Sequence, residues 1–167
     1  VIDTDTDSGL AMVAKKIGKP KAMFFLDKAV KGWIPGSNAL WLKAAEQAQK
    51  LDEPWLFLEP DAVPTRQSWA IEIQAEYRRI GKPYIGALVE HKNAFQPSPY
   101  LEGCSIYPAT AFSEIGGMVK PDKSWTLSTA SYVVPRASNS PLFQHLWGEK
   151  DTPPTFAKNA VPGTNIF

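Results

Sequence analysis

Short apolar runs alternate with longer amphipathic segments along this chain. The runs are bounded by Gly, Pro or charged residues, which is the pattern of buried β-strands. We therefore predict strands at residues 21–26, 55–59, 83–89, 102–108 and 142–147. Two longer segments carry apolar residues at helical spacing, which predicts helices at residues 38–51 and 64–80. Further helices are predicted at residues 8–17 and 109–116, from their capping and stop residues, and at the less periodic residues 125–132. The Gly- and Pro-containing stretch 31–38 is predicted to be a loop.

The alternation of strands and helices indicates the fold class. Strands that are covered on both faces read as continuous apolar runs, as "KAMFFL" and "WLFLE" do here. We expect an α/β domain with a mostly parallel sheet flanked by helices on both faces. In such sheets ligands bind beyond the carboxyl ends of the strands, which is where Asp27, Glu59 and Asp61 fall.

Chain length, charge balance and cysteine count limit the kinds of protein that this sequence can encode. The 167 residues suffice for one domain with a substantial core, so residues 1–167 are taken as a single unit. The 18 Lys and Arg residues nearly balance the 17 Asp and Glu residues, so no overall field favours extended nucleic-acid binding. A single cysteine, Cys104, excludes an internal disulfide and disfavours structural zinc.

Targeting patterns are missing from the sequence. No run of about 18 apolar residues predicts a membrane span, and no signal-peptide pattern is visible, so a cytoplasmic location is expected. The chain begins with Val and stops abruptly at "PGTNIF". We therefore expect a segment of a longer protein, truncated at both ends.

The acidic stretch "DTDTDSG" at residues 3–9 resembles the start of an EF-hand calcium loop. That loop needs Gly at its sixth position and a bidentate Glu at its twelfth. Ser8 and Ala14 occupy those positions, so the second half of the ligand cage is missing. We reject the EF-hand and interpret the stretch as a polar turn that caps the first predicted helix.

The segment "WLFLEPDAVP" is a stronger chemical signal. Its apolar run leads directly into Glu59 and Asp61, and Pro60 and Pro64 stiffen the backbone around the two carboxylates. Carboxylates that are held close together repel each other unless a cation or hydrogen bonds compensate. Mg²⁺ or Mn²⁺ would provide that compensation through oxygen ligands. On the local pattern alone, two solvated loop residues explain the segment as well.

The order of segments around this motif resembles the nucleotide-sugar glycosyltransferases of the GT-A fold. In that family a helix with a G-x-N pattern packs behind a strand that ends in a metal-binding D-x-D motif. Here the pattern is "GSN" followed by "LEPD", an E-x-D variant. "EYRRIGKPYIG", "YLEGCSIYPATAF" and "FQHLWG" resemble the later segments, so the similarity covers most of residues 20–150.

The resemblance implies a metal site and a donor site. Asp61 would be the main ligand of Mn²⁺ or Mg²⁺, with Glu59 reaching the metal through water or contacting the donor ribose. His145 would complete the metal shell or contact the diphosphate.

The donor would be a nucleoside-diphosphate sugar. Asp27 would contact the nucleoside, and Gly36 and Asn38 would let their helix approach the donor closely. The acceptor stays open among a glycan, a lipid, a protein and a modified base.

An inverting transferase also needs a carboxylate that takes the proton of the acceptor hydroxyl. Glu102 and Asp122 are the candidates for this catalytic base. Thr126 stands where the family pattern would favour an acid. A retaining enzyme would need no such base.

Aromatic residues divide into two predicted groups. Trp41, Trp55 and Trp69 lie in periodic apolar segments and are expected in the core. Four others lie in or near predicted loops and are candidate platforms for sugar rings, although packing also explains them: Trp33, Tyr100, Tyr107 and Trp125. Cys104 has no neighbouring His, so a cysteine nucleophile is not expected.

Two further functions compete with an active transferase. A catalytically inactive, glycosyltransferase-like module for carbohydrate binding or assembly would explain the missing acid at Thr126. A nucleotidyltransferase would use a related scaffold and acidic site. It is disfavoured because no Gly-rich phosphate loop followed by Lys is present near the first predicted strand.

Overall fold

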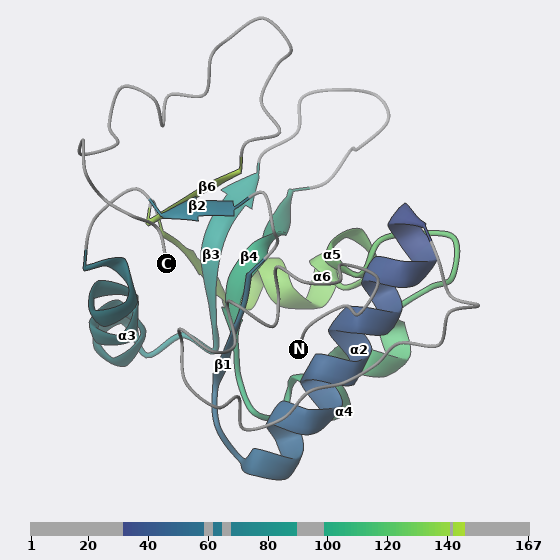
Figure 1. Cartoon of the computed structure of the whole chain (residues 1–167), viewed down its shortest axis with the longest axis horizontal. Coiled ribbons are helices and arrows are strands. Elements are labelled where there is room, and N and C mark those ends of the chain that lie inside the picture. The colour runs from purple at the N-terminus through teal and green to yellow at the C-terminus, as the bar shows by residue number, and fades with distance from the viewer. Residues whose placement is uncertain (1–31, 59–61, 65–67, 90–98, 141, 146–167) are drawn as a thin grey trace, which may run out of the picture.

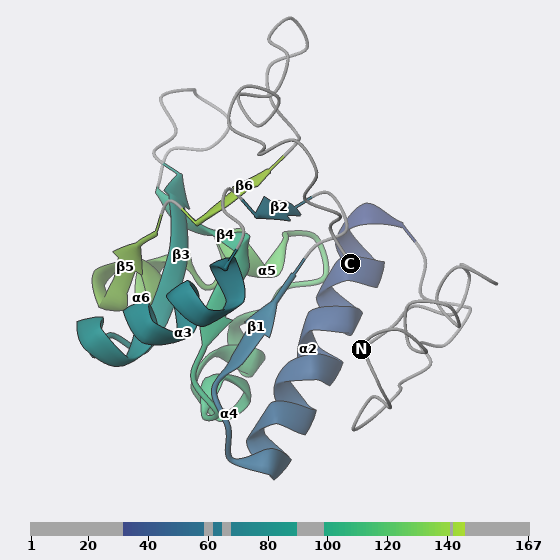
Figure 2. The ribbon, with the colours of Figure 1, turned by 60° about the vertical axis from the view of Figure 1, so that its left-hand side comes forward.

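A four-stranded mixed sheet forms the centre of the molecule. The computed structural model describes residues 32–58, 62–64, 68–89, 99–140 and 142–145. The strand order is β1 (Trp55–Phe57), β4 (Tyr100–Tyr107), β3 (Tyr84–Val89) and β5 (Ala137–Asn139); Figure 1 labels β1, β4 and β3, and Figure 2 also labels β5 beside β3. β4 is antiparallel to both β1 and β3, whereas β5 is parallel to β3.

The prediction of a mostly parallel sheet is therefore wrong for the described part of the chain. A strand that is buried on both faces has the same apolar pattern in either direction, so hydropathy does not reveal its orientation. The short segment between β3 and β4 is the physical reason for their antiparallel pairing. A parallel crossover needs a dozen or more residues and usually a helix, and residues 90–99 are too few.

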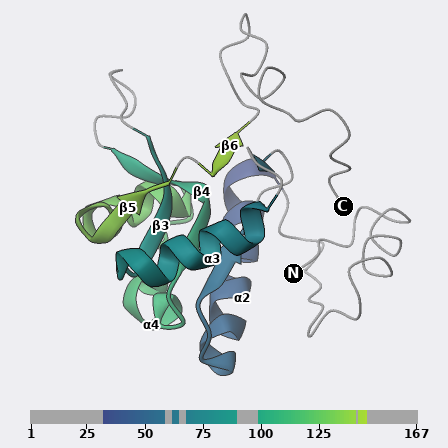
Figure 3. The ribbon, with the colours of Figure 1, turned by 90° about the vertical axis from the view of Figure 1, so that its left-hand side faces the viewer.

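Helices cover both faces of the sheet, as predicted. One face carries α2 (Trp33–Leu51), α4 (Ala111–Ile115), α5 (Trp125–Ser128) and α6 (Ala130–Val133). The opposite face carries α3 (Trp69–Ile80), which lies in front of the strands in Figure 3 while α2 lies behind them. The α/β class and the helices on both faces are thus confirmed.

Two buried clusters match these layers. The aromatic core joins α2, α4, α5 and α6 to the sheet and is built around five rings: Trp41, Phe57, Tyr84, Tyr107 and Trp125. On the other face, Ile73 of α3 packs with Ile85, Cys104 and Ile106. Successive residues of β1 and β4 point to opposite faces of the sheet, which is why one strand supplies both clusters.

Helix α2 begins earlier than the sequence predicted. The stretch 31–38 was expected to be a loop, but the helix starts at Trp33 and includes Pro35 and Gly36. Pro35 is the third helical residue, where the missing N–H has no partner inside the helix to lose. Gly36 N–H donates the first helical hydrogen bond, to Gly32 O at 3.0 Å. The predicted C-terminus at Leu51 is confirmed.

Helix α3 begins later than predicted, at Trp69 rather than at residue 64. Pro64 belongs instead to β2 (Ala62–Pro64), which pairs antiparallel with β6 (Phe143–His145) in a separate two-stranded sheet. The predicted strand at 142–147 is confirmed by β6.

Most of the remaining elements follow the predictions, but β5 and the 3₁₀ turn before it were not predicted. β3 and β4 match the runs at 83–89 and 102–108, and α4 with the 3₁₀ turn Gly116–Met118 matches 109–116. The helix expected at 125–132 is divided into α5 and α6 at Thr129, and a 3₁₀ turn, Val134–Arg136, leads into β5. The helix and the strand predicted at 8–17 and 21–26 lie outside the described residues.

Candidate functional site

Several predicted site residues belong to elements that meet at one end of the sheet. β1 and β3 both run antiparallel to β4, so both finish at the same end, which we call the carboxyl edge. In Figure 2 the arrowhead of β1 points toward this end, where α5, β2 and β6 also lie. Glu59 and Asp61 follow β1 in sequence, but they lie outside the described residues, as does Asp27.

Glu102 lies beyond the carboxyl end of β1. Phe57, the last residue of β1, is paired with Ser105 of β4. β4 runs in the opposite direction to β1. Glu102, which comes three residues before Ser105, therefore lies beyond the last residue of β1 at the carboxyl edge. Its side chain is half-buried. The structure therefore places this candidate base at the predicted end of the sheet.

A β-bulge reshapes β4 at this point. Gly86 pairs with Ser105 and Leu88 pairs with Leu101, so three residues of β4 stand opposite one residue of β3. The fully buried Ser105 hydroxyl donates to Glu102 O at 2.6 Å across the bulge. Such bulges redirect side chains and are frequent beside active sites. The bulge thus sets the backbone from which Glu102 projects.

Gly86 is required by the same bulge. A Cβ atom built at this position would lie 1.9 Å from Ser105 Oγ and 3.0 Å from the backbone oxygen of Cys104. On the other side of β3, Leu88 N–H donates to Asn139 Oδ1 at 3.0 Å, and Ser140 N–H donates to Gly86 O at 2.8 Å. Local sequence patterns signalled none of these contacts, since the partners are distant in the chain.

Asn38 binds the loop that carries Asp122. Its side chain is 5% exposed. Nδ2 donates to Lys120 O and to Lys123 O, both at 2.9 Å, and Oδ1 accepts from Trp125 N–H at 2.8 Å. Asp122 is exposed within this Asn38-bound loop, residues 120–124.

The amide of Asn38 is thus engaged by the protein's own backbone, and the close approach of its helix to a donor stays a prediction. Gly36 lies two residues earlier in the first turns of α2 and is half-buried.

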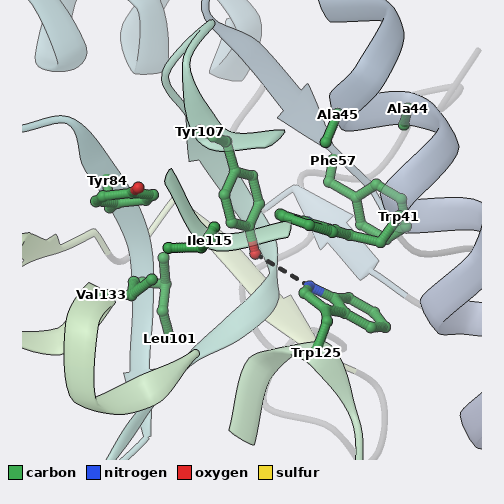
Figure 4. Packing of buried hydrophobic residues seen from close by; sticks show 11 residues of the cluster. Trp41, Ala44, Ala45, Phe57, Tyr84, Leu101, Tyr107, Ile115, Trp125 and Val133 are labelled. Atoms are coloured by element: carbon green, nitrogen blue, oxygen red, sulfur yellow. Dashed lines mark hydrogen bonds between the residues drawn. The ribbon is translucent and has the colours of Figure 1, made fainter. Parts of the chain in front are cut away.

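An aromatic contact joins this loop to the end of β1. The rings of Phe57 and Trp125 lie 5.3 Å apart, edge to face, and Trp125 Nε1 donates to the hydroxyl of Tyr107 at 3.3 Å (Figure 4). Trp125 directly follows the loop, so this packing fixes one end of the loop next to the last residue of β1. Glu102, Asn38 and Asp122 are therefore carried by segments that converge on the carboxyl edge.

Two predicted sugar platforms are core residues instead. Trp125 and Tyr107 are 1% and 2% exposed, so neither ring face is available to a sugar, and that interpretation is wrong for both. Tyr100 is half-buried, and the side chain of Trp33 lies outside the described part. Trp41 is fully buried in the aromatic core, as predicted, and Trp55 and Trp69 pack against the two clusters.

The pairing of β2 with β6 places the backbone of His145 opposite the residue that follows Asp61. Ala62 is the register partner of His145, and β6 also contacts β3. The backbone of His145 is described, whereas its side chain is not. Within residues 32–58, 68–89 and 99–140, no group of three His, Cys, Asp or Glu side chains could hold a metal ion.

A second polar centre lies near the other end of β3 and was not predicted. Glu114 of α4 accepts hydrogen bonds from the hydroxyls of Thr110 at 2.5 Å, Tyr84 at 2.7 Å and Tyr132 at 3.4 Å. Burial alone would raise the pKa of Glu114, but these three hydrogen bonds and nearby Arg136 outweigh it and lower the pKa. Burial, and then the bond to Glu114, raise the pKa of Tyr84. The only local signal was the spacing of Thr110 and Glu114 by four residues.

No helix in the described ranges is long and apolar enough to cross a membrane. Comparison of the chain with protein-family models, with curated proteins and with solved structures gave no significant match in any of the three searches.

Proposed function

We propose that this protein is a metal-dependent glycosyltransferase, which moves a sugar from a nucleoside-diphosphate donor to an acceptor at the carboxyl edge. One observation supports the proposal above the others. The residue after Asp61 is paired with His145, while β1, which precedes Glu59 in sequence, ends at Phe57, whose ring contacts Trp125 at the start of α5. Residues that the family resemblance assigns to one site thus belong to, or adjoin, elements that meet at one edge.

The residues assigned to the metal form a plausible ligand set. Carboxylate oxygens from Asp61 and Glu59 with an imidazole nitrogen from His145 suit Mn²⁺, and the carboxylates alone suit Mg²⁺. The register of Ala62 with His145 supports this set because it brings the backbones of these segments together. When bound, the divalent cation would stabilise negative charge on the departing diphosphate.

The protein's own side chains would serve the acceptor. Glu102 or Asp122 would accept the proton of the acceptor hydroxyl as its oxygen bonds to the sugar carbon and the bond to the diphosphate breaks. Both carboxylates belong to segments at the carboxyl edge, Glu102 on the bulge and Asp122 on the Asn38-bound loop. Asp27, Gly36 and Glu59 keep their proposed roles toward the donor.

A thermal-shift panel tests the function. We expect Mn²⁺ with the matching nucleoside diphosphate, among UDP, GDP and ADP, to raise the melting temperature, because ligands that bind only the folded state stabilise it. Asp61→Asn should abolish the shift, while Asp52→Asn, an exposed change at the C-cap of α2, should preserve it. An unchanged melting curve with every nucleotide would contradict the proposal.

An inactive carbohydrate-binding module is the second candidate, and one observation favours it. Thr126, which stands where the family pattern favours an acid, lies in the first turn of α5, and its hydroxyl is within 2.9 Å of Ser124 Oγ. This position therefore holds a hydroxyl group that is engaged by its neighbour. Binding of free sugars that needs no metal and survives Asp61→Asn would support the module over the enzyme.

A further inference from the structure

The Asn38-bound loop is fixed more firmly than an ordinary surface loop. Exposed turns are usually satisfied by water or by their own side chains. Here a buried amide from another element binds two carbonyls and one N–H of the segment 120–125. Asn38 thereby uses both of its N–H donors and its oxygen on a single loop.

A serine hydroxyl of α5 also binds the loop backbone at two points. Ser128 Oγ donates to Lys123 O and accepts from Lys120 N–H, both at 3.3 Å, and Ser124 caps the first turn of α5. Asp122 stands between the two residues that Asn38 binds, and its own side chain is exposed. A fixed backbone beneath an exposed carboxylate is the arrangement that preorganises a group for proton transfer.

We propose that Asn38 is a positioning residue, which holds the loop so that Asp122 can serve as the base for the acceptor. This inference rests on the proposed function. Asp122 would take the proton of an acceptor O–H, the acceptor oxygen would bond to the sugar carbon, and the nucleoside diphosphate would leave with the electrons of the broken C–O bond. Asn38 acts through the loop and touches neither substrate.

The first test is independent of any activity. We expect Asn38→Ser to raise the hydrogen-exchange rates of the amides of residues 122–125 relative to the rest of the chain. Gln49→Ser is the matched control, because Gln49 lies at the other end of α2 and accepts one backbone bond, from Ser113 N–H at 3.0 Å. Unchanged exchange in the loop would overturn the link between Asn38 and Asp122, whatever the protein does.

The second test measures turnover. Release of nucleoside diphosphate would be followed with Mn²⁺ and UDP-glucose, UDP-N-acetylglucosamine or GDP-mannose, with water as the acceptor. We expect Asp122→Ala to lower the rate by about 100-fold or more and to remove the limb of the pH profile that reports the base. The nucleotide-induced thermal shift should stay, because Asp122 serves the acceptor.

Asn38→Asp separates positioning from a purely structural role. It keeps an acceptor for Trp125 N–H but loses the two donors to Lys120 O and Lys123 O. We expect a 10- to 100-fold slower release with an unchanged nucleotide shift, since displacement by about 1 Å has effects of this size. If this variant does not fold, Asn38→Ser replaces it in the same assay.

The double variant tests whether Asn38 acts through Asp122. If Asn38 acts through Asp122, then Asn38→Asp with Asp122→Ala should be within about twofold of Asp122→Ala alone, because coupled residues are not additive. If the two substitutions multiply their effects on the rate, Asn38 does not act through Asp122. If Asp122→Ala keeps full activity, Asp122 is not the base. If the unchanged protein neither binds nor turns over any nucleotide, the proposed function fails and the base role of Asp122 with it, while the exchange result still decides the Asn38 link.

Discussion

Two different polar centres hold the helices of this molecule in place. Near the carboxyl edge, the buried neutral amide of Asn38 binds three backbone groups of one loop. Near the opposite end of β3, the exposed carboxylate of Glu114 accepts from three side-chain hydroxyls. Both centres border the aromatic core.

The two centres differ in how easily water replaces a hydrogen bond that a substitution removes. Water can solvate Glu114 if a hydroxyl is removed, since the carboxylate is exposed. The Asn38 side chain and its bond from Trp125 N–H are buried, and its bonds to Lys120 O and Lys123 O are partly buried, so water replaces these bonds less easily. The first centre should therefore be intolerant of substitution and insensitive to pH, whereas the second should be tolerant and sensitive to pH.

The largest expected effect is that of Asn38→Ala. Removing the amide leaves Lys120 O, Lys123 O and Trp125 N–H without this partner, and we expect a loss of about 2–4 kcal/mol in the free energy of unfolding. Urea unfolding followed by tryptophan fluorescence measures it. Gln49→Ala, at the exposed end of the same helix, should stay within about 0.5 kcal/mol. Equal losses in the two variants would remove the distinction between the centres.

The sequence predicted where the helices and strands lie better than it predicted which of them pair or pack together. Hydrophobic runs located β1, β3, β4 and β6, because burial of apolar side chains is a local property of the pattern. Strand direction was missed, since a strand covered on both faces has the same pattern in either direction. The loop predicted at 31–38 failed because Pro35 is as acceptable in the first turn of a helix as in a loop.

The candidate site shows the same division. Glu102, Asn38 and Asp122 were all selected from sequence, but the contacts of Asn38 span 82 to 87 residues and have no local signature. Trp125 and Tyr107 were candidate sugar platforms because they lie in or near predicted loops, whereas their packing with Phe57 and Trp41 makes them core. The Glu114 centre was missed because Tyr84 and Glu114 are 30 residues apart.

The next effect in size is that of Tyr84→Phe. This change removes the buried hydroxyl that donates to Glu114 at 2.7 Å and keeps the ring that packs in the aromatic core. We expect a loss of about 1 kcal/mol, because the exposed carboxylate can recover a partner from water. Chemical unfolding of this variant beside Asn38→Ala gives the comparison. A loss that exceeds that of Asn38→Ala would reverse the ranking of the two centres.

Glu114→Gln should show the pH dependence of the second centre. The pKa of Glu114 is lowered in the folded protein from its ordinary value of 4.5. Its stabilisation is therefore present above about pH 4.5 and is lost as the pH falls through the folded-state pKa. We expect the difference in melting temperature between the unchanged protein and Glu114→Gln to narrow below about pH 4.5.

Asn38→Ala provides the control for this titration, because an amide does not change its charge. Its deficit should be constant from pH 7 to pH 4, apart from effects shared by every variant. A deficit of Glu114→Gln that is equally constant would show that charge plays no part in the second centre.

The smallest expected effect is that of Glu46→Gln on the exposed face of α2. Hydrogen bonds from Lys50 at 2.8 Å and from Lys43 at 2.9 Å lower the pKa of Glu46 to about 2. Because all three groups face water, we expect the melting temperature to change by less than about 2 °C. Added salt should raise the pKa of Glu46, measured by NMR titration, toward its ordinary value, because salt weakens solvent-exposed ion pairs. Burial raises the pKa of Glu114 and the hydroxyl donors are the main cause of its lowering, so this pKa should respond less to the same salt. Equal responses would mean that Arg136, rather than the three hydroxyls, dominates the Glu114 centre.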